Sequence, residues 1–210
     1  MIRVGVIDYG VGNLRSVSNA VTHLGAHAVV SSQAAELSQC DRLILPGVGA
    51  FAHGMQALRE RGLDAEIVRW ANAGKPLLGI CLGMQLLLES SSEFGHAQGL
   101  GIVPGHIDAL DRLPQAAQAL RLPHVSWAPV RPVSPAANAL LRGLPPEATF
   151  YFVHSYALSA DNPHCLAESD YLGVRFAAVV GSGSVFGVQF HPEKSGPAGL
   201  QLLQNFLFAA

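Results

Sequence analysis

The chain has 210 residues with a formal net charge of −2 at pH 7, and half of its residues are hydrophobic. This charge balance gives no basic field for binding a polyanion, which argues against a nucleic-acid partner. No uninterrupted apolar run reaches the roughly 18 residues needed to span a bilayer. We therefore expect no membrane span, and we assign the surplus apolar side chains to a buried parallel sheet and to a protein–protein interface.

The three cysteines, Cys40, Cys81 and Cys165, are odd in number and contain no C-x-x-C pair. Both features argue against a disulfide framework and against a structural zinc site. The first apolar segment begins at residue 2, which leaves too short a lead for a signal peptide. We expect reduced thiols, a cytoplasmic location, and no metal or cofactor. Buried packing is the expected role of Cys40 and Cys165.

Five short segments rich in β-branched residues have the pattern of strands buried on both faces. They are residues 4–8, 42–45, 76–80, 174–180 and 185–190. Such strands belong in the interior of an α/β sheet.

Helical patterns separate the early strands. Residues 14–24 end at Gly25, and residues 55–73 end at Gly74, both suitable for the left-handed residue that closes a helix. This alternation predicts βαβ units and a parallel sheet with helices on both sides. Functional residues are then expected at the carboxyl ends of the strands.

The pattern loosens into Ser-, Gly- and Pro-rich pieces over residues 89–122. The C-terminal half then shows further strands, such as residues 149–156, before a closing helix over residues 200–208. No linker, repeat or low-complexity tract separates a second unit. The sequence predicts one α/β domain over residues 1–210, with a mixed, mainly parallel sheet flanked by helices.

A cysteine between two glycines follows the predicted strand 76–80, in Gly79-Ile80-Cys81-Leu82-Gly83, and an apolar helix comes next. This is the layout of a nucleophile elbow, with Cys81 in the nucleophile position. The glycines relieve crowding around a strained turn, the helix N-terminus favours the thiolate, and the Leu82 amide is placed to bind an oxyanion. By itself the motif fits equally well a buried cysteine between packing glycines.

His191-Pro192-Glu193 follows the last predicted strand. Residues two apart on extended backbone point the same way, so Glu193 can bond one imidazole nitrogen and leave the other to exchange a proton with Cys81. In isolation, a surface loop with two polar residues is the alternative. Together with the elbow, the motif predicts a Cys81–His191–Glu193 triad.

Two glycine-containing segments follow other strands. In Pro46-Gly47-Val48-Gly49, the Gly47–Val48 peptide or Gly49 can supply the second oxyanion donor, although a plain turn is the alternative. Residues 8–16 invite a dinucleotide-binding interpretation, but Arg15 replaces the third glycine and no acidic residue follows about 20 positions later. We reject that interpretation, and a tight strand–helix turn remains open.

The remaining histidines show no pair at metal-ligand spacing, and we expect most of them at the surface. They are His23, His27, His53, His96, His106, His124, His154 and His164.

With these motifs in place, the chain resembles the class I, triad-type glutamine amidotransferases from end to end. Within this class, four segments are most similar to the glutaminase subunits of imidazole glycerol phosphate synthases. They are residues 8–16, 46–49 and 152–156, and Lys194-Ser195 after Glu193. The resemblance implies a flavodoxin-like fold. It also implies that L-glutamine is hydrolysed through a thioester on the cysteine. The ammonia would pass to a (βα)8-barrel cyclase partner in histidine biosynthesis.

The resemblance further assigns residues to glutamine and to the partner. Glutamine would be held by Gly49, Gln85, Ser155 and Tyr156, and the oxyanion by Leu82, Val48 and Gly49. The partner interface near the ammonia exit would include Asn13, Trp127, Tyr151 and Lys194. The chain departs from the family at residues 124–128, where His-Val-Ser-Trp-Ala stands in place of the common His-x-Gly-Trp-Asn.

Three alternatives accompany this interpretation. The same glutaminase chemistry could feed another synthase, for example one that amidates a sugar. The chain could also be a non-catalytic binding module of the same fold, although the intact triad speaks against it. A peptidase or other hydrolase of similar fold is the third alternative.

Overall fold

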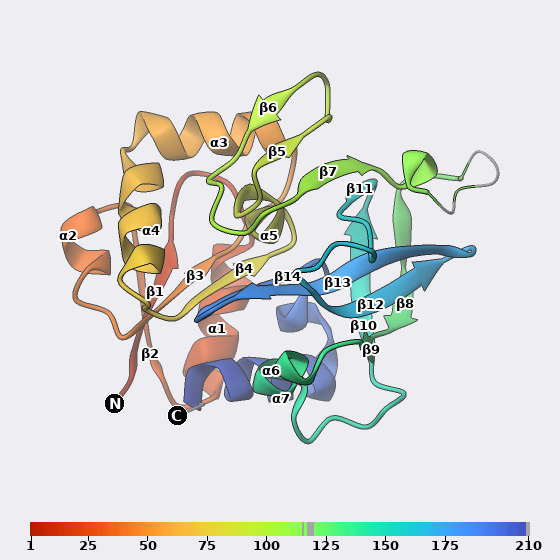
Figure 1. The fold of residues 1–210 in the computed structure, drawn as a ribbon. Coiled ribbons are helices and arrows are strands. Elements are labelled where there is room, and N and C mark those ends of the chain that lie inside the picture. The colour runs from red at the N-terminus through yellow and green to blue at the C-terminus, as the bar shows by residue number, and fades with distance from the viewer. Residues whose placement is uncertain (115, 117–119, 209–210) are drawn as a thin grey trace.

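A central sheet of eight strands organises the computed structural model, which describes residues 1–114, 116 and 120–208 (Figure 1). The five neighbouring strands from β2 to β14 run parallel, and the remaining three continue antiparallel. In spatial order they are β2 (His27–Ser31), β1 (Arg3–Ile7), β3 (Arg42–Leu45), β4 (Leu77–Ile80), β14 (Val185–Val188), β13 (Val174–Ser182), β12 (Cys165–Tyr171) and β9 (Arg131–Pro132). The predicted mixed, mainly parallel α/β sheet is confirmed.

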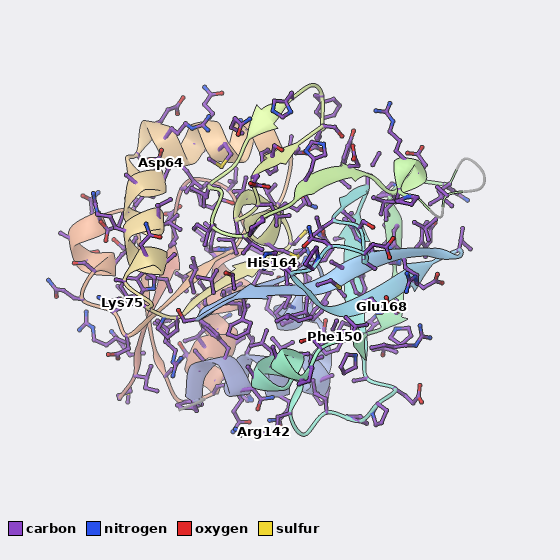
Figure 2. The ribbon with its side chains drawn as sticks, viewed as in Figure 1. Asp64, Lys75, Arg142, Phe150, His164 and Glu168 are labelled. Atoms are coloured by element: carbon purple, nitrogen blue, oxygen red, sulfur yellow. The ribbon has the colours of Figure 1, made fainter. Side chains whose placement is uncertain are left out.

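Helices cover both faces of this sheet (Figure 1). One face carries α1 (Leu14–His23), α6 (Asn138–Leu141) and α7 (Gly196–Phe208), and the other carries α2 (Ala34–Leu37), α3 (Phe51–Glu60), α4 (Leu63–Asn72) and α5 (Leu82–Leu86). Strand side chains alternate between the faces: Ile44 joins the cluster beneath α1 and α7, whereas Leu43 and Leu45 join the cluster beneath α3 and α4. Phe150 packs into the first cluster (Figure 2).

Two smaller sheets and three short 3₁₀ turns complete the described chain. The first sheet pairs β8 (His124–Pro129) with β10 (Thr149–His154), and the second contains β11 (Tyr156–Ala157), β7 (His106–Ala109), β5 (Ser90–Ser91) and β6 (Ala97–Gln98). The turns are η1 (Leu110–Arg112), η2 (Pro135–Ala137) and η3 (Pro192–Lys194). None of the helices in the described ranges has the length and apolarity to cross a bilayer.

Several element predictions need correction. The helix predicted over residues 55–73 is two helices, because Gly62 adopts a left-handed conformation (φ 65°) between α3 and α4. Strands β2 and β12 were not predicted, since polar and apolar side chains mix along both. The predicted strand 149–156 divides into β10 and β11, the strand 185–190 ends at Val188, and the closing helix begins at Gly196.

The parallel strands bring their carboxyl ends to one edge of the sheet. The segments that follow β1, β3, β4 and β14 carry residues 8–13, residues 46–49, Cys81 and His191. Because neighbouring parallel strands end at the same edge, these segments meet just beyond the carboxyl ends of the strands. This is where an α/β protein places its functional site.

Candidate active site

Cys81 occupies a sharp turn between β4 and α5. Its backbone has φ 54° and ψ −111°, a strained conformation for a residue other than glycine. Its amide donates a hydrogen bond of 2.8 Å to the carbonyl of Val188 on the neighbouring strand β14. The backbone therefore has the geometry expected of a nucleophile elbow, and a pairing with the sheet holds it there.

Close packing explains the two glycines of the elbow. A Cβ atom on Gly79 would lie 2.7 Å from the carbonyl oxygen of Gly83, and one on Gly83 would lie 1.8 Å from that of Leu45. Both contacts involve backbone, which cannot move aside as a side chain can. Only glycine fits at either position, in agreement with the crowding argument made from the sequence.

His191 and Glu193 form a buried pair. The imidazole Nδ1 lies 2.9 Å from Glu193 Oε1, and at most 2% of either side chain is exposed. The intervening backbone is not extended as predicted: Pro192 opens the 3₁₀ turn η3, which folds Glu193 back beside the ring. Glu193 Oε1 also accepts a longer hydrogen bond of 3.5 Å from Asn13 Nδ2, so a residue from the turn after β1 supports the carboxylate.

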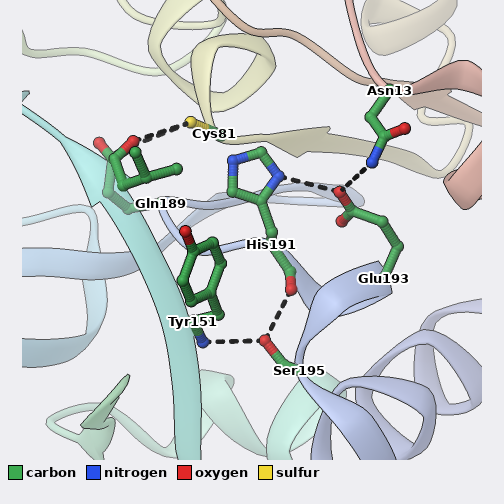
Figure 3. A network of polar contacts seen from close by, with 8 residues as sticks. Asn13, Cys81, Tyr151, Gln189, His191, Glu193 and Ser195 are labelled. Carbon is green, nitrogen blue, oxygen red and sulfur yellow. Dashed lines mark hydrogen bonds and ion pairs between the residues drawn. The ribbon is translucent and has the colours of Figure 1, made fainter. Parts of the chain in front are cut away.

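The imidazole lies between the thiol and the carboxylate (Figure 3). Since Nδ1 is engaged by Glu193, Nε2 on the sulfur side is the nitrogen that can exchange a proton with Cys81 Sγ. Burial alone would lower the pKa of His191, but interactions with Cys81 and with Glu193 outweigh it and raise the pKa to about 9. A pKa above neutrality favours the protonated form of this ring.

Gln189 is a further neighbour of the thiol that sequence reasoning missed. Its side chain is fully buried, and its Nε2 lies 3.8 Å from Cys81 Sγ. Its Oε1 accepts a hydrogen bond of 3.0 Å from Gln85 Nε2. Gln189 follows the end of β14 directly and lies two residues before His191. Only the alternation of side chains along the strand could have indicated that it faces the thiol.

Tyr9 answers the question left open for residues 8–16. The ring is fully buried, and the hydroxyl donates a hydrogen bond of 2.8 Å to the carbonyl of Pro46. A Cβ atom on Gly47 would lie 2.5 Å from this hydroxyl and 2.8 Å from the Gly83 amide nitrogen. The turn after β1 thus supports the Pro46–Gly49 loop, and that loop packs directly on the elbow.

A cavity of about 350 Å³ opens beside the thiol. This volume is in the lower range for small-ligand sites. All the residues predicted to hold glutamine or its oxyanion line it, together with Cys81 and His191. They are Val48, Gly49, Leu82, Gln85, Ser155 and Tyr156. Glu93 also lines the cavity and was missed, because nothing in its local sequence marks it; its carboxylate accepts a hydrogen bond from the Phe51 amide.

The residues predicted at a partner interface lie around His191 and Glu193. Tyr151 and Trp127 face each other across the β8–β10 pairing, and their ring centroids are 6.1 Å apart. Trp127 is 54% exposed, and Lys194 is also exposed. The Tyr151 carbonyl accepts a hydrogen bond from the His191 amide, so this group borders the pair directly.

Most of the eight remaining histidines lie at the surface, as predicted. His23, His27, His53, His96 and His106 are exposed and His164 is half-buried, but His124 and His154 are buried. The two rings pair across β8 and β10, which the sequence could not indicate because 29 residues separate them. Cys40 and Cys165 are buried free thiols, as predicted. No cluster of metal-ligating side chains occurs among the described residues.

The family model described as "Glutamine amidotransferase class-I" matches residues 5–210. Imidazole glycerol phosphate synthase subunit HisH of Desulfitobacterium hafniense is 48% identical over 203 residues, which cover 97% of this chain and 92% of that protein. Subunit HisH 1 of Pseudomonas aeruginosa is 47% identical over 210 residues, covering 99% and 97%. The chain belongs to the HisH group of class-I glutamine amidotransferases.

Solved structures agree with this HisH assignment at the level of the fold. The structure of PurLQS from Thermotoga maritima matches with a TM-score of 0.73 and 20% identity, covering 98% of this chain and 97% of that one. A crystal structure titled only as a glutamine amidotransferase matches with a TM-score of 0.71 and 22% identity, covering 97% and 96%. The predicted class I amidotransferase fold is therefore confirmed.

Proposed function

We propose that this HisH chain is the glutaminase subunit of an imidazole glycerol phosphate synthase, with residues 1–210 forming one amidotransferase domain in the cytoplasm. It hydrolyses L-glutamine to glutamate and ammonia, and the ammonia passes to a (βα)8-barrel cyclase partner in histidine biosynthesis. The relatives that carry this name match nearly the whole chain. The observation that carries the chemistry is the buried His191–Glu193 pair beside the elbow thiol.

The reaction begins with Cys81. The thiolate attacks the side-chain carbonyl carbon of glutamine, and the developing oxyanion is bound by the Leu82 amide and by the Val48 or Gly49 amide. The Nε2 proton of His191 goes to the departing nitrogen, so ammonia leaves and a thioester remains. His191 then takes a proton from water, which attacks the thioester; the Cys81 thiolate leaves, restoring the starting pair with the protonated His191, and the product carboxyl group loses its proton to solvent to give glutamate. Glu193 holds the imidazole in one orientation throughout.

The cavity fits a small polar substrate. Ser155, Tyr156, Gln85 and Gly49 offer polar groups along its wall, and the Glu93 carboxylate can pair with the substrate's α-ammonium group. Because the cavity walls are otherwise built by Val48, Leu82 and neighbouring apolar groups, water is partly excluded from the thiol, which strengthens these polar contacts.

The partner surface comprises Asn13, Trp127, Tyr151 and Lys194. An exposed tryptophan next to a tyrosine is typical of the buried centre of a protein interface. This surface borders His191, so ammonia formed there has a short route to a protein seated on it. Such a route matters because ammonia is mostly protonated, and not nucleophilic, in neutral water.

Labelling and coupled turnover test the proposal. A glutamine analogue bearing a diazoketone should alkylate Cys81, detected by peptide mass spectrometry, and should fail to label Cys81→Ala. Mixed with the barrel cyclase, the wild-type chain should support glutamine-dependent cyclisation, whereas Cys81→Ala should support only cyclisation with added ammonium. Glutaminase activity retained in Cys81→Ala would refute the triad. Labelling without any association with this cyclase would instead favour a glutaminase that serves another synthase.

A further inference from the structure

A pair of buried histidines forms the wall behind the cavity. His154 of β10 lines the cavity, and His124 of β8 lies opposite it in the register of the two strands. The Nδ1 atom of His124 is 3.1 Å from Nε2 of His154. Around them pack the rings of Phe152, Tyr171 and Phe176. The roles proposed above do not use either histidine.

The hydrogen bonds fix the proton positions on both rings. His154 Nδ1 lies 3.0 Å from the carbonyl oxygen of Tyr156, which can only accept, so Nδ1 carries the proton. Burial lowers the pKa of His154 to about 3, so its ring is neutral and its Nε2 is an acceptor. His124 Nδ1 must then donate to that nitrogen.

His124 on β8 is in the same protonation state as His154. Burial lowers the pKa of His124 to about 4, so this ring is also neutral and its Nε2 accepts. The Ser126 hydroxyl, 2.7 Å away, must be the donor. Ser126, His124 and His154 therefore donate in one direction, ending on the Tyr156 carbonyl. The residue after Ser126 on this strand is the exposed Trp127.

The Tyr156 carbonyl connects this row of hydrogen bonds to Gln85, on the thiol side of the cavity. It also accepts a hydrogen bond of 3.0 Å from Gln85 Nε2. The other hydrogen on Nε2 is donated to Gln189 Oε1. Because a carbonyl oxygen can only accept, this pairing requires the nitrogen, not the oxygen, of the Gln85 amide to face Tyr156. The amide oxygen of Gln85 is left as the group that can meet a ligand in the cavity.

We propose that His154, held in its Nδ1–H tautomer by His124 and Ser126, is a positioning residue for glutamine. Its N–H fixes the Tyr156 carbonyl, and that carbonyl orients the Gln85 amide so that its oxygen faces the substrate's ammonium group. This inference rests on the proposed glutaminase function. It assigns to the β8–β10 sheet a part in substrate affinity, which acts through the hydrogen bond between His124 and His154.

Two variants of His154 separate positioning from packing. In His154→Asn, the amide nitrogen occupies the place of Nδ1 and can still donate to Tyr156. In His154→Gln, the amide group occupies the place of Nε2, so the donor to Tyr156 is lost. With the cyclase present, we expect His154→Gln to raise the KM for glutamine about tenfold and to change kcat less than about threefold, while His154→Asn stays within about threefold of wild type in both. Equal KM values in the two variants would overturn the proposal.

Nuclear magnetic resonance of the wild-type chain tests the tautomers directly. Long-range ¹H–¹⁵N spectra of ¹⁵N-histidine-labelled protein, assigned by single substitutions, should show both His124 and His154 protonated on Nδ1 at neutral pH. A His154 ring protonated on Nε2 contradicts the proposal whatever the kinetics show.

Controls keep the outcomes distinct. Ammonium-dependent cyclisation should be unchanged in every variant that folds and docks. A wild-type complex without glutaminase activity would mean that the proposed function fails; an active wild type with equal KM values in the variants means that only this inference fails. If His154→Gln does not fold, Ser126→Ala and Ser126→Thr decide: the first should raise the KM about threefold, and the second, which keeps the hydroxyl, should not.

Discussion

Cys81 and His191 are held in place by different means. The thiol depends on backbone: a strained φ of 54°, an amide bond to Val188 and glycines that no other residue can replace. The imidazole depends on side chains: Glu193, two residues along the chain, engages its Nδ1, and Asn13, from the distant turn after β1, supports the carboxylate. Substitutions of the elbow glycines should therefore act mainly on folding, and substitutions around the imidazole mainly on proton transfer.

Two substitutions of Cys81 itself should change activity the most. Both Cys81→Ala and Cys81→Gly should lose glutaminase activity by at least about 10⁴-fold, because the nucleophile is absent. Only glycine adopts the positive φ without strain. The free energy of unfolding of Cys81→Gly should therefore exceed that of Cys81→Ala by about 1 kcal/mol, measured by urea denaturation. Equal stabilities would show that the elbow stores no backbone strain.

Gly83→Ala should produce the largest loss of stability. Its Cβ would lie 1.8 Å from the Leu45 carbonyl oxygen, so β3 and α5 must separate. We expect a loss of at least about 3 kcal/mol in the free energy of unfolding, measured by urea denaturation. Gly54→Ala is the matched control: the nearest atoms to a Cβ there are the ends of the Leu82 and Leu86 side chains, at 3.2 Å or more, and stability should change by less than about 1 kcal/mol. Similar losses in both variants would remove the special role of the elbow packing.

Glu193→Gln tests the side-chain side of the comparison. The pKa of His191 is raised to about 9, so the proton that the leaving ammonia needs is held below that pH and lost above it. Replacing the carboxylate with a neutral amide should lower the pKa of His191. The decrease should be partial, because Cys81 also raises this pKa. We expect kcat/KM to fall by roughly 10²- to 10⁴-fold and its basic limb to move to lower pH. A basic limb that stays at its wild-type pH would show that the limb does not report the titration of His191.

The same raised pKa has a consequence for stability. A histidine that binds its proton more tightly in the folded state stabilises the fold fully below its ordinary pKa of about 6.5, and this contribution is lost as pH rises through about 9. In Glu193→Gln the loss should begin at lower pH, which urea denaturation at several pH values would reveal.

The comparison also explains what the sequence could predict. The elbow is a local pattern, since strand, glycine spacing and helix all lie within residues 77–87, and its geometry followed from steric arguments. The position of Glu193 was right for the wrong reason, because a 3₁₀ turn replaces the extended backbone that was expected. Gln189, Tyr9 and the His124–His154 pair were missed, since each gains its role from a partner that only the folded chain brings near.

Tyr9→Phe should have a modest effect, and it tests whether the turn after β1 supports the loop after β3 in its proposed oxyanion role. The hydroxyl donates to the Pro46 carbonyl in a fully buried site, so its removal leaves that carbonyl unpaired at a cost of about 1 kcal/mol. If the loop supplies an oxyanion donor, kcat should fall several-fold while the KM for glutamine changes little, because the contact strengthens only as charge develops. Tyr171→Phe is a suitable control, since its hydroxyl bonds the Arg121 carbonyl on the exposed side. A stability loss without any change in kcat would make Tyr9 a purely structural support, and the oxyanion role of the loop would lose this argument.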